Sequence, residues 1–539
     1  MAATRTIRLP VLGAAPVDEP RPSGLLDRLL REQQELTAVE RFAQRHAGAG
    51  PLLEPIYRAR LPASPPGPGQ QYAFEVDLDA CSGCKACVAA CHRLNGLDPG
   101  ETWRTVGTLH GGGAAAPVLK TVTSACHHCV DPACLAGCPV DAYEKDPVTG
   151  IVRHLDDQCI GCRYCTLTCP YEVPQFSAAR GIVRKCDMCS DRLGAGEAPA
   201  CVQACPSGAI AIKVVDVAAA IEDAQGEAFL PGAPSPAITV PTTTYVSAEP
   251  LPRNLLPADF YAVRPAHAHA PLVVMLVLTQ LAVGALVVDR LLAALTPTAA
   301  APLAPVAAGL ALGTALVALA ASTLHLGRPR FAFRAVLGVR TSWVSREILA
   351  FGAFAAAASA HALGGGRWPA MGAAAALLGV AGVGSSVMLY AVTHRAWWGL
   401  GRTLARFTGT LVVLGLAAVL VVAAATGATD LADALAAALI AAVAIKLAID
   451  LAVLVHLRDR VHGELKRTAI LLTTQLRGVL FARVTTATLG AVLALVAVVD
   501  GLAAVPAGFA LAALVAGELL ERTLFFVAAS APRMPGTFR

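Results

Sequence analysis

The sequence predicts an α+β domain that contains every cysteine, followed by an all-α bundle of eight helices long enough to span a membrane. Two features of the sequence divide the chain this way. All 16 cysteines lie between Cys81 and Cys205, and long apolar runs begin only after Ala270. The content of 55% hydrophobic and 15% charged residues is unusual for a soluble protein and ordinary for a chain that is half membrane.

Length and charge set further limits. A chain of 539 residues is too long for one hydrophobic core, so several domains are expected. The formal net charge of +5 is modest, and the arginines of the C-terminal half lie between apolar segments. They form no basic stripe of the kind that binds nucleic acid, so no nucleic-acid partner is expected.

The cysteines fall into four groups of four with short, repeated spacing. The groups are Cys81, Cys84, Cys87 and Cys91; Cys126, Cys129, Cys134 and Cys138; Cys159, Cys162, Cys165 and Cys169; and Cys186, Cys189, Cys201 and Cys205. A cubane iron–sulfur cluster needs thiolates on its four irons. A C-x2-C-x2-C loop supplies three of them, and the cysteine that follows binds the other cluster of a pair. The spacing therefore predicts iron–sulfur clusters.

Zinc and disulfide bonds are the competing interpretations of so many cysteines. Paired C-x2-C motifs also bind zinc. Zinc ribbons, however, do not give quadruplets that end in Cys-Pro, as the last three groups do here, nor do they repeat one quadruplet. Disulfides would need an export signal, and residues 1–20 contain neither an apolar segment of signal length nor a twin-arginine pair.

The exchange of the fourth cysteine predicts how the groups combine. Groups one and four are expected to form one ferredoxin-like unit, with groups two and three forming a second unit inserted within it. The expected ligand sets are Cys81, Cys84, Cys87 with Cys205; Cys186, Cys189, Cys201 with Cys91; Cys126, Cys129, Cys134 with Cys169; and Cys159, Cys162, Cys165 with Cys138.

The cysteine motifs resemble a known family. CSGCKACVAAC, CHHCVDPACLAGCP, CIGCRYCTLTCPYEVP and KCDMCSDR…CVQACP are similar to the four-cluster subunit of the DMSO-reductase family of molybdenum enzymes, over roughly residues 70–215. The resemblance implies an electron path between a molybdopterin-containing catalytic subunit and a membrane quinone. Related nitrate-reductase subunits have Trp where this chain has Cys162, so four 4Fe–4S clusters are expected here. Group one departs from the pattern by ending in Cys91-His92.

Eight apolar segments follow a Pro-rich stretch, and each is close to the roughly 20 residues that cross a bilayer as helix. Small residues suit close packing between them. The segments lie near 271–288, 301–324, 346–364, 369–393, 406–427, 432–455, 479–499 and 504–528. The chain is thus expected to comprise an N-terminal helix and linker (1–70), a four-cluster ferredoxin-like domain (71–230), a Pro-rich linker (231–268) and an eight-span anchor (269–530) in contact with membrane lipid.

The basic residues of the short loops predict orientation. Loops after the second, fourth and sixth segments are rich in Arg and Lys, whereas the other loops offer only Arg290 and Arg367. The basic loops share a side with both termini. The chain is therefore expected in the inner (cytoplasmic) membrane as a multi-pass protein, with the iron–sulfur domain on the cytoplasmic side.

A second resemblance concerns the segment STLHLGRPRFAFRAVLGVRTSWVSREILAF, which is similar to the DmsC-type anchor of the same enzyme family. Anchors of this type hold a quinone site and no haem. The resemblance, and the cost of ionisable groups at membrane depth, point to His325 as a hydrogen-bond partner of quinone and to Glu347 as a proton relay. Arg328 and Arg346 are expected to orient the headgroup or Glu347. Alternatively, His325 caps its helix and Glu347 pairs with Arg346.

The remaining polar residues of the bundle are expected to have structural roles. Lys446 and Asp450 are spaced i,i+4 and are expected to neutralise each other, while Glu518, Glu521 and Arg522 form an internal salt bridge. The segment LLDRLLREQQELTAVERFAQRH has helical apolar spacing, and it either docks on a catalytic partner or covers its own cluster domain.

The sequence thus predicts a non-catalytic, quinone-reactive electron-transfer subunit of an oxidoreductase complex. Two alternatives remain: an energy-converting quinone module similar to NrfD-type complexes, and a stand-alone relay between ferredoxin and quinone. A co-purifying molybdopterin subunit would separate the first interpretation from the other two.

Overall fold

The computed structural model describes residues 24, 25, 29, 30, 54–428, 431–499, 504–530, 534 and 535. The chain divides into two compact units, Met1–Pro55 and Ile56–Arg539. The helix expected near the N-terminus lies outside the described residues, apart from the four isolated positions.

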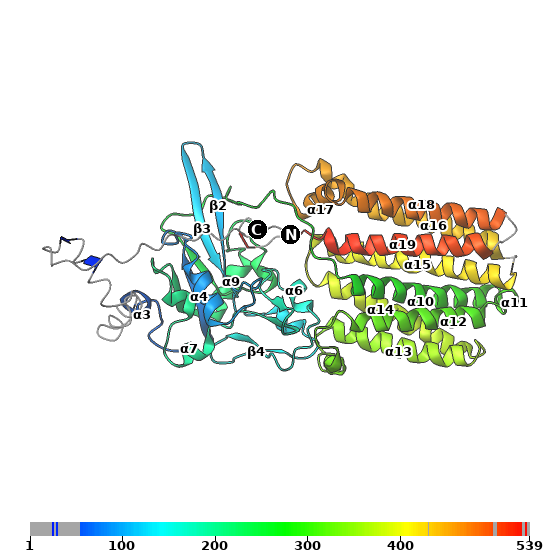
Figure 1. Ribbon diagram of the computed structural model, residues 1–539, viewed down its shortest axis with the longest axis horizontal. Coiled ribbons are helices and arrows are strands. Elements are labelled where there is room, and N and C mark those ends of the chain that lie inside the picture. The colour runs from blue at the N-terminus through cyan, green and yellow to red at the C-terminus, as the bar shows by residue number, and fades with distance from the viewer. Residues whose placement is uncertain are drawn as a thin grey trace, which may run out of the picture. The chain divides into compact units, whose positions relative to one another are not determined.

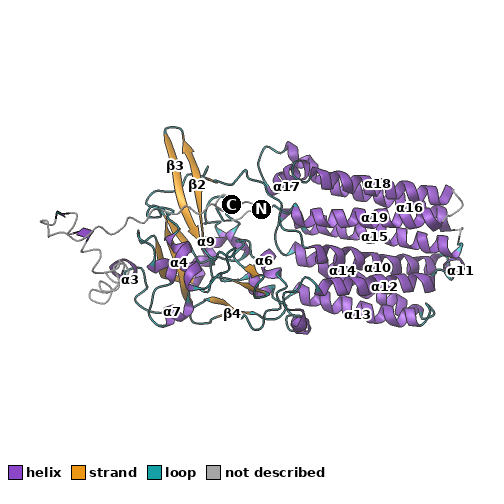
Figure 2. Cartoon of the chain, viewed as in Figure 1, coloured by secondary structure: helices purple, strands orange, loops and turns teal. Residues whose placement is uncertain are grey.

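The cysteine-bearing part of the second unit combines short helices with small sheets (Figure 2). Its helices are α3 (Glu54–Arg58), α4 (Ala86–Leu94), α5 (Ala133–Ala136), α6 (Tyr164–Thr168), α7 (Ser190–Gly194), α8 (Ala200–Gln203), α9 (Val217–Gln225) and η1 (Pro236–Ile238). Its strands are β1 (Gln70–Asp77), β2 (Thr105–Gly113), β3 (Ala116–Ser124), β4 (Tyr143–Lys145), β5 (Val152–His154), β6 (Gln175–Ser177), β7 (Ile182–Arg184), β8 (Ile210–Asp216), β9 (Thr244–Val246) and β10 (Leu256–Pro257).

Two three-stranded sheets and two hairpins make up the described β structure. The first sheet has the order β8-β1-β9, in which β1 pairs antiparallel with β8 and parallel with β9. The second has the order β10-β2-β3, and β2–β3 forms a long hairpin that projects from the domain (Figure 1). The Pro-rich stretch expected to be a plain linker therefore supplies an edge strand, β9 or β10, to each sheet.

The C-terminal part consists of long helices that run alongside one another (Figure 1). The described helices of this part, short ones included, are α10 (Ala270–Leu295), α11 (Pro297–Ala300), α12 (Ala304–Thr323), η2 (Pro329–Val336), α13 (Trp343–Leu363), α14 (Pro369–Ala391), η3 (Ala396–Trp398), α15 (Leu400–Thr426), α16 (Ala432–Leu451), η5 (Ala452–Arg458), α17 (Glu464–Thr473), α18 (Arg477–Val499) and α19 (Ala504–Val527).

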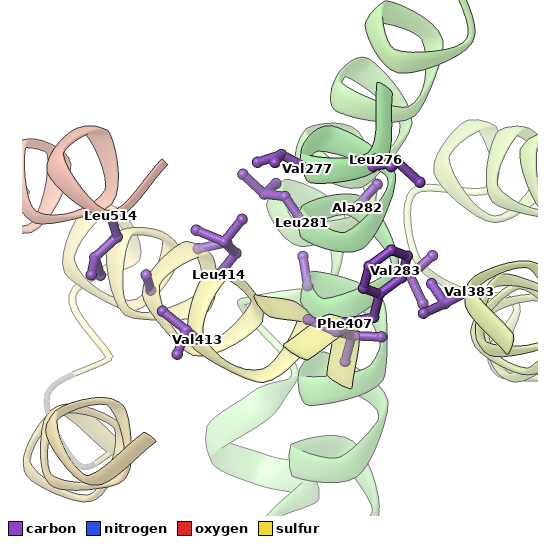
Figure 3. Packing of buried hydrophobic residues seen from close by; sticks show 14 of the residues in the cluster. Leu276, Val277, Leu281, Ala282, Val283, Val383, Phe407, Val413, Leu414 and Leu514 are labelled. Carbon is purple, nitrogen blue, oxygen red and sulfur yellow. The ribbon is translucent and has the colours of Figure 1, made fainter. Parts of the chain in front are cut away.

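Close packing around α10 and α15 forms the centre of the bundle. Leu281, Val283 and Leu414 interdigitate there with residues of neighbouring helices (Figure 3). Gly284 faces Gly415, and a Cβ atom on Gly284 would lie 2.1 Å from the carbonyl oxygen of Leu411. Small residues thus allow the two backbones to approach closely, as in membrane helix pairs.

Within the described residues, seven helices are long and apolar enough to cross a membrane: α10, α12, α14, α15, α16 continued by η5, α18 and α19. The expected segment 346–364 is also helical, as α13, but it is not among the seven. Arg346, Glu347 and His361 make α13 less apolar than its neighbours. Length and composition therefore support seven spans.

A buried charged network joins four helices of the bundle. Its described members are Arg406, Lys446, Asp450, Arg483, Glu518, Glu521 and Arg522. Arg483 connects α16 to α19, because it donates to Asp450 at 3.0 Å and to Glu518 at 2.6 Å. The two local pairings expected from the sequence are therefore parts of one network.

Candidate metal centres and the adjoining membrane site

All 16 cysteines line four cavities, with four cysteines around each. The first cavity is lined by Cys81, Cys84, Cys87 and Cys205; the second by Cys126, Cys129, Cys134 and Cys169; the third by Cys91, Cys186, Cys189 and Cys201; and the fourth by Cys138, Cys159, Cys162 and Cys165. These are the same four sets as the expected ligand sets. Four thiols around each cavity suit one kind of occupant in all four.

Each cavity is lined by one Cys-x2-Cys turn, and the four turns share a backbone feature. The residue before the second cysteine has a positive φ in all four turns: Gly83 at 73°, His128 at 42°, Gly161 at 70° and Met188 at 60°. This left-handed residue bends the backbone so that both thiols point into one cavity. Glycine accepts that conformation without strain, whereas His128 and Met188 adopt it at an energetic cost.

Short helices carry the remaining thiols and link the cavities in pairs. Helix α4 brings Cys87 to the first cavity and, one turn later, Cys91 to the third. In return, Cys205 from the segment after α8 lines the first cavity. The fourth cysteine of each group therefore lies with a different group.

The donor set fits an iron–sulfur cluster. Burial raises the pKa of Cys91 to about 12, and burial raises the pKa of Cys138 and Cys169 to about 11. Buried thiolates require a positive partner, and iron would supply it. Burial acts in the same direction on Cys159, but His154 and the backbone amides of Val183 and Gly161 together lower the pKa of that thiol.

The cavities follow one another in a definite order. Cys87 of the first cavity and Cys201 of the third pack in one core, together with Cys126 of the second cavity. Cys134 of the second cavity packs against the separate core around the fourth. Cys162 of the fourth cavity also packs against the core of the helical bundle. Cys87 of the first cavity interacts electrostatically with Cys201 of the third, and Cys186 of the third interacts with Cys126 of the second. The order is therefore first, third, second, fourth and then the bundle.

Glycines bring the fourth cavity into direct backbone contact with the loop between α12 and α13. A Cβ atom on Gly327 would lie 2.0 Å from the carbonyl oxygen of Gly181, and one on Gly161 would lie 2.8 Å from Gly327. The amide of Gly327 donates to the carbonyl of Gly161 at 3.3 Å, and that of Arg328 donates to Ile160 at 3.0 Å. This loop therefore packs directly against the turn that carries Cys159 and Cys162.

The same loop meets the fourth cavity at a second point. The amide of Gly338 donates to the carbonyl of Pro139 at 3.0 Å, next to Cys138. Ser342, the residue before α13, donates its hydroxyl hydrogen to the carbonyl of Gly137 at 2.7 Å. The loop between α12 and α13 thus contacts both chain segments that line the fourth cavity.

His325 and Glu347 lie beside the two residues that follow Cys162. Burial, and further the charge of Arg163, lower the pKa of His325 to about 4. The Nδ1 atom of His325 is buried and finds no hydrogen-bond partner in the described part of the chain. Tyr164 donates its hydroxyl hydrogen to the carbonyl of Leu389 at 2.7 Å. Burial first, and then the Glu347 carboxylate, raise the pKa of Tyr164. Both candidates therefore face the segment that carries Cys162.

Glu347 is buried and accepts a hydrogen bond from the hydroxyl of Ser386 on α14. The two arginines have other partners. Arg328 donates to the carbonyl of Asp156 at 2.7 Å, and Arg346 donates to the carbonyls of Val339 and Arg340. Among the described residues, no side-chain hydrogen bond or ion pair joins either arginine to His325 or Glu347.

Two buried cations near the cavities were not singled out from the sequence. Arg104 lines the third cavity and Lys185 lines the second. No motif marks Arg104. Lys185 could have been noticed because it directly precedes Cys186.

Comparisons with known proteins agree with this two-part organisation. The family model of a 4Fe-4S dicluster domain matches residues 118–215, and that of the DMSO reductase anchor subunit (DmsC) matches residues 265–527. The chain is 37% identical to the B subunit of anaerobic dimethyl sulfoxide reductase of Escherichia coli (strain K12) over 154 residues, which are 27% of this chain and 75% of the relative.

Two further relatives are similar to part of this chain. The probable anaerobic dimethyl sulfoxide reductase chain YnfG of Escherichia coli (strain K12) is 38% identical over 148 residues, which are 26% of this chain and 72% of the relative. The hydrogenase-2 operon protein HybA of Escherichia coli O157:H7 is 35% identical over 184 residues, 29% of this chain and 56% of the relative. The chain therefore belongs to the family of DMSO-reductase-type iron–sulfur electron-transfer subunits and carries the multi-pass membrane anchor of that system in the same polypeptide.

Proposed function

We propose that this protein holds four 4Fe–4S clusters, one in each cavity, and passes electrons between a membrane quinone and a catalytic subunit. The observation that carries the proposal is the sorting of all 16 cysteines into four cavities with four thiols each. The clusters would supply one-electron carriers. The pairwise exchange of cysteines supports a tandem of ferredoxin-like units.

The route that we propose follows the order of the cavities. The first cavity contains Cys84, which is exposed to solvent, so electrons are exchanged with a partner protein at that end. At the other end, the fourth cavity adjoins the loop between α12 and α13. A quinone near His325 and Glu347 would thus be separated from the fourth cluster by little more than Cys162 and its neighbours.

His325 and Glu347 have the chemistry that a quinone needs. A quinol releases two protons with its two electrons, so a titratable group is required at its hydroxyls. The buried Nδ1 of His325, which has no hydrogen-bond partner among the described residues, is available for a quinone oxygen. Glu347, hydrogen-bonded by Ser386, would take or give the proton. Arg328 and Arg346 would hold the loop, through its carbonyl contacts, rather than touch the headgroup.

We further propose a molybdopterin-containing catalytic partner, because two of the relatives named above are chains of dimethyl sulfoxide reductases. The anchor would cross the inner membrane eight times, with α13 as the eighth span, and the basic loops would place the cluster domain on the cytoplasmic side. The identity of the partner is independent of the cluster assignment.

Metal analysis of the complex, gently solubilised from native membranes, tests both parts. Four cubanes predict about 16 iron atoms per chain, and the catalytic partner adds molybdenum or tungsten in equal amount to the chain. Iron near that level without either metal would reject the molybdoenzyme partner and favour the stand-alone relay or the energy-converting module. Iron near half that level would reject the four-cluster assignment.

A further inference from the structure

Two buried cations, Arg104 and Lys185, lie beside the cysteine cavities. Arg104 is 2% exposed and Lys185 is 3% exposed. Within the described residues, neither side chain forms an ion pair with Asp or Glu. By contrast, Arg184, which is also buried in this domain, is paired with Glu101 at 3.1 Å. The charges of Arg104 and Lys185 must therefore be balanced by other groups.

Arg104 lies between the first and third cavities. Its Nη1 atom donates to the hydroxyl of Thr123 at 3.4 Å, and that hydroxyl lies 3.7 Å from the sulfur of Cys87 in the first cavity. The guanidinium carbon stands 4.6 Å from the centroid of the Phe74 ring. The Nη2 atom is buried and has no hydrogen-bond partner among the residues that the structure describes, in a side chain that lines the third cavity. The guanidinium thus has an unused donor beside the cysteines of the third cavity.

Lys185 occupies the corresponding place between the second and third cavities. Its ammonium group donates to the carbonyls of Val152 and Cys186, and its side chain lines the second cavity. The next residue, Cys186, lines the third cavity and packs in one core with Cys126 of the second. The buried ammonium therefore lies where the thiols of two cavities approach each other.

An unpaired cation in a protein interior is costly unless an opposite charge lies nearby. A cluster with four thiolate ligands is anionic, and it gains one more negative charge when it accepts an electron. In a buried site, a neighbouring fixed positive charge stabilises the reduced form more than the oxidised form. Reduction moves one electron between adjacent clusters and needs no proton from either side chain.

We propose that Arg104 and Lys185 are charge-compensating residues that raise the reduction potentials of the clusters in the third and second cavities. The inference rests on the proposed function, because it needs clusters in these cavities. It goes beyond that function because it concerns the reduction potentials of the clusters. The clusters in the third and second cavities should have higher reduction potentials than they would have without these two cations.

The fourth cavity provides an internal comparison, because the cations that line it are compensated or partly exposed. His154 pairs with Asp156 at 2.8 Å. Arg163 is only partly buried, and its guanidinium carbon stands 3.6 Å from the centroid of the Phe176 ring. Neither Arg104 nor Lys185 lines this cavity, so a cluster there should respond little to changes at either residue.

The test is a redox titration of the intact complex in membranes, followed by low-temperature EPR of the reduced clusters. R104Q removes the charge, R104K retains it, and R93Q removes an exposed arginine from the neighbouring helix α4 as a matched control. At a fixed ambient potential, R104Q should lower the ratio of reduced to oxidised form at least tenfold for one of the clusters. For a one-electron couple, that change corresponds to a reduction potential lower by about 59 mV. R104K and R93Q should titrate as the unaltered protein does.

An R104Q protein with full iron and an unchanged titration would overturn the proposal. Should R104Q lose iron, K185Q decides in the same way: a lowered potential supports the proposal, and an unchanged one rejects it. The absence of cluster signals from the unaltered protein would instead reject the proposed function, so the two failures are distinguishable.

Discussion

The glycine contact between the cluster domain and the bundle can be disturbed by a single substitution at Gly327. A Cβ atom on Gly327 would lie 2.0 Å from the carbonyl oxygen of Gly181, whereas real Cβ contacts essentially never fall below 3.0 Å. Gly327→Ala must therefore separate the two backbones by at least 1.0 Å, the difference between those two distances. Overpacking of this kind costs about 1–3 kcal/mol. That cost lowers the equilibrium constant for docking the loop against the cluster domain roughly 5- to 150-fold.

The assay is the rate at which added quinone reoxidises dithionite-reduced clusters in membranes. G327A should slow reoxidation at least about fivefold, by the lower limit above, while iron content stays unchanged. Gly313→Ala on α12 is the matched control, because a Cβ atom there would meet no atom within 4 Å. If G327A keeps full iron and the unaltered rate, electrons do not depend on this contact and the proposed route is wrong.

Two further substitutions probe the cavities and the bundle. Cys162→Ser removes one thiolate from the fourth cavity and should lower the iron content by about one to four atoms per chain; unchanged iron would mean that Cys162 is not a ligand. Arg483→Met leaves Asp450 and Glu518 without their shared partner, and breaking such a buried network should cost about 3–5 kcal/mol. Thermal unfolding in detergent measures that loss, and an unchanged Tm would show that the network does not stabilise the bundle.

The grouping of the cysteines around the four cavities could be predicted from the sequence, because cluster ligation follows a local, repeated rule. Every group begins with a Cys-x2-Cys pair and ends with two cysteines separated by three residues, the last of which goes to the paired group. The left-handed turns were less visible: Gly83 and Gly161 are natural occupants of a positive φ, but nothing in the sequence marks His128 and Met188 for that conformation.

Contacts between distant segments could not be predicted in the same way. Gly161, Gly181 and Gly327 meet only after folding, and no spacing rule connects them. The i,i+4 pair of Lys446 and Asp450 was visible on one helix, whereas its connection through Arg483 to another helix depends on helix packing. Among the described residues, seven helices meet the requirements of length and composition for a span, and α13, which carries Arg346 and Glu347, does not.

The most direct test of the central claim is quinone reoxidation of the clusters in membranes that contain H325A, E347Q or both substitutions. H267A and E222Q, at exposed positions, are the matched controls. The account predicts that both controls reoxidise as the unaltered protein does and that the double variant is at least tenfold slower with full iron, which corresponds to about 1.4 kcal/mol. A double variant with full iron and the unaltered rate would contradict a quinone site at His325 and Glu347.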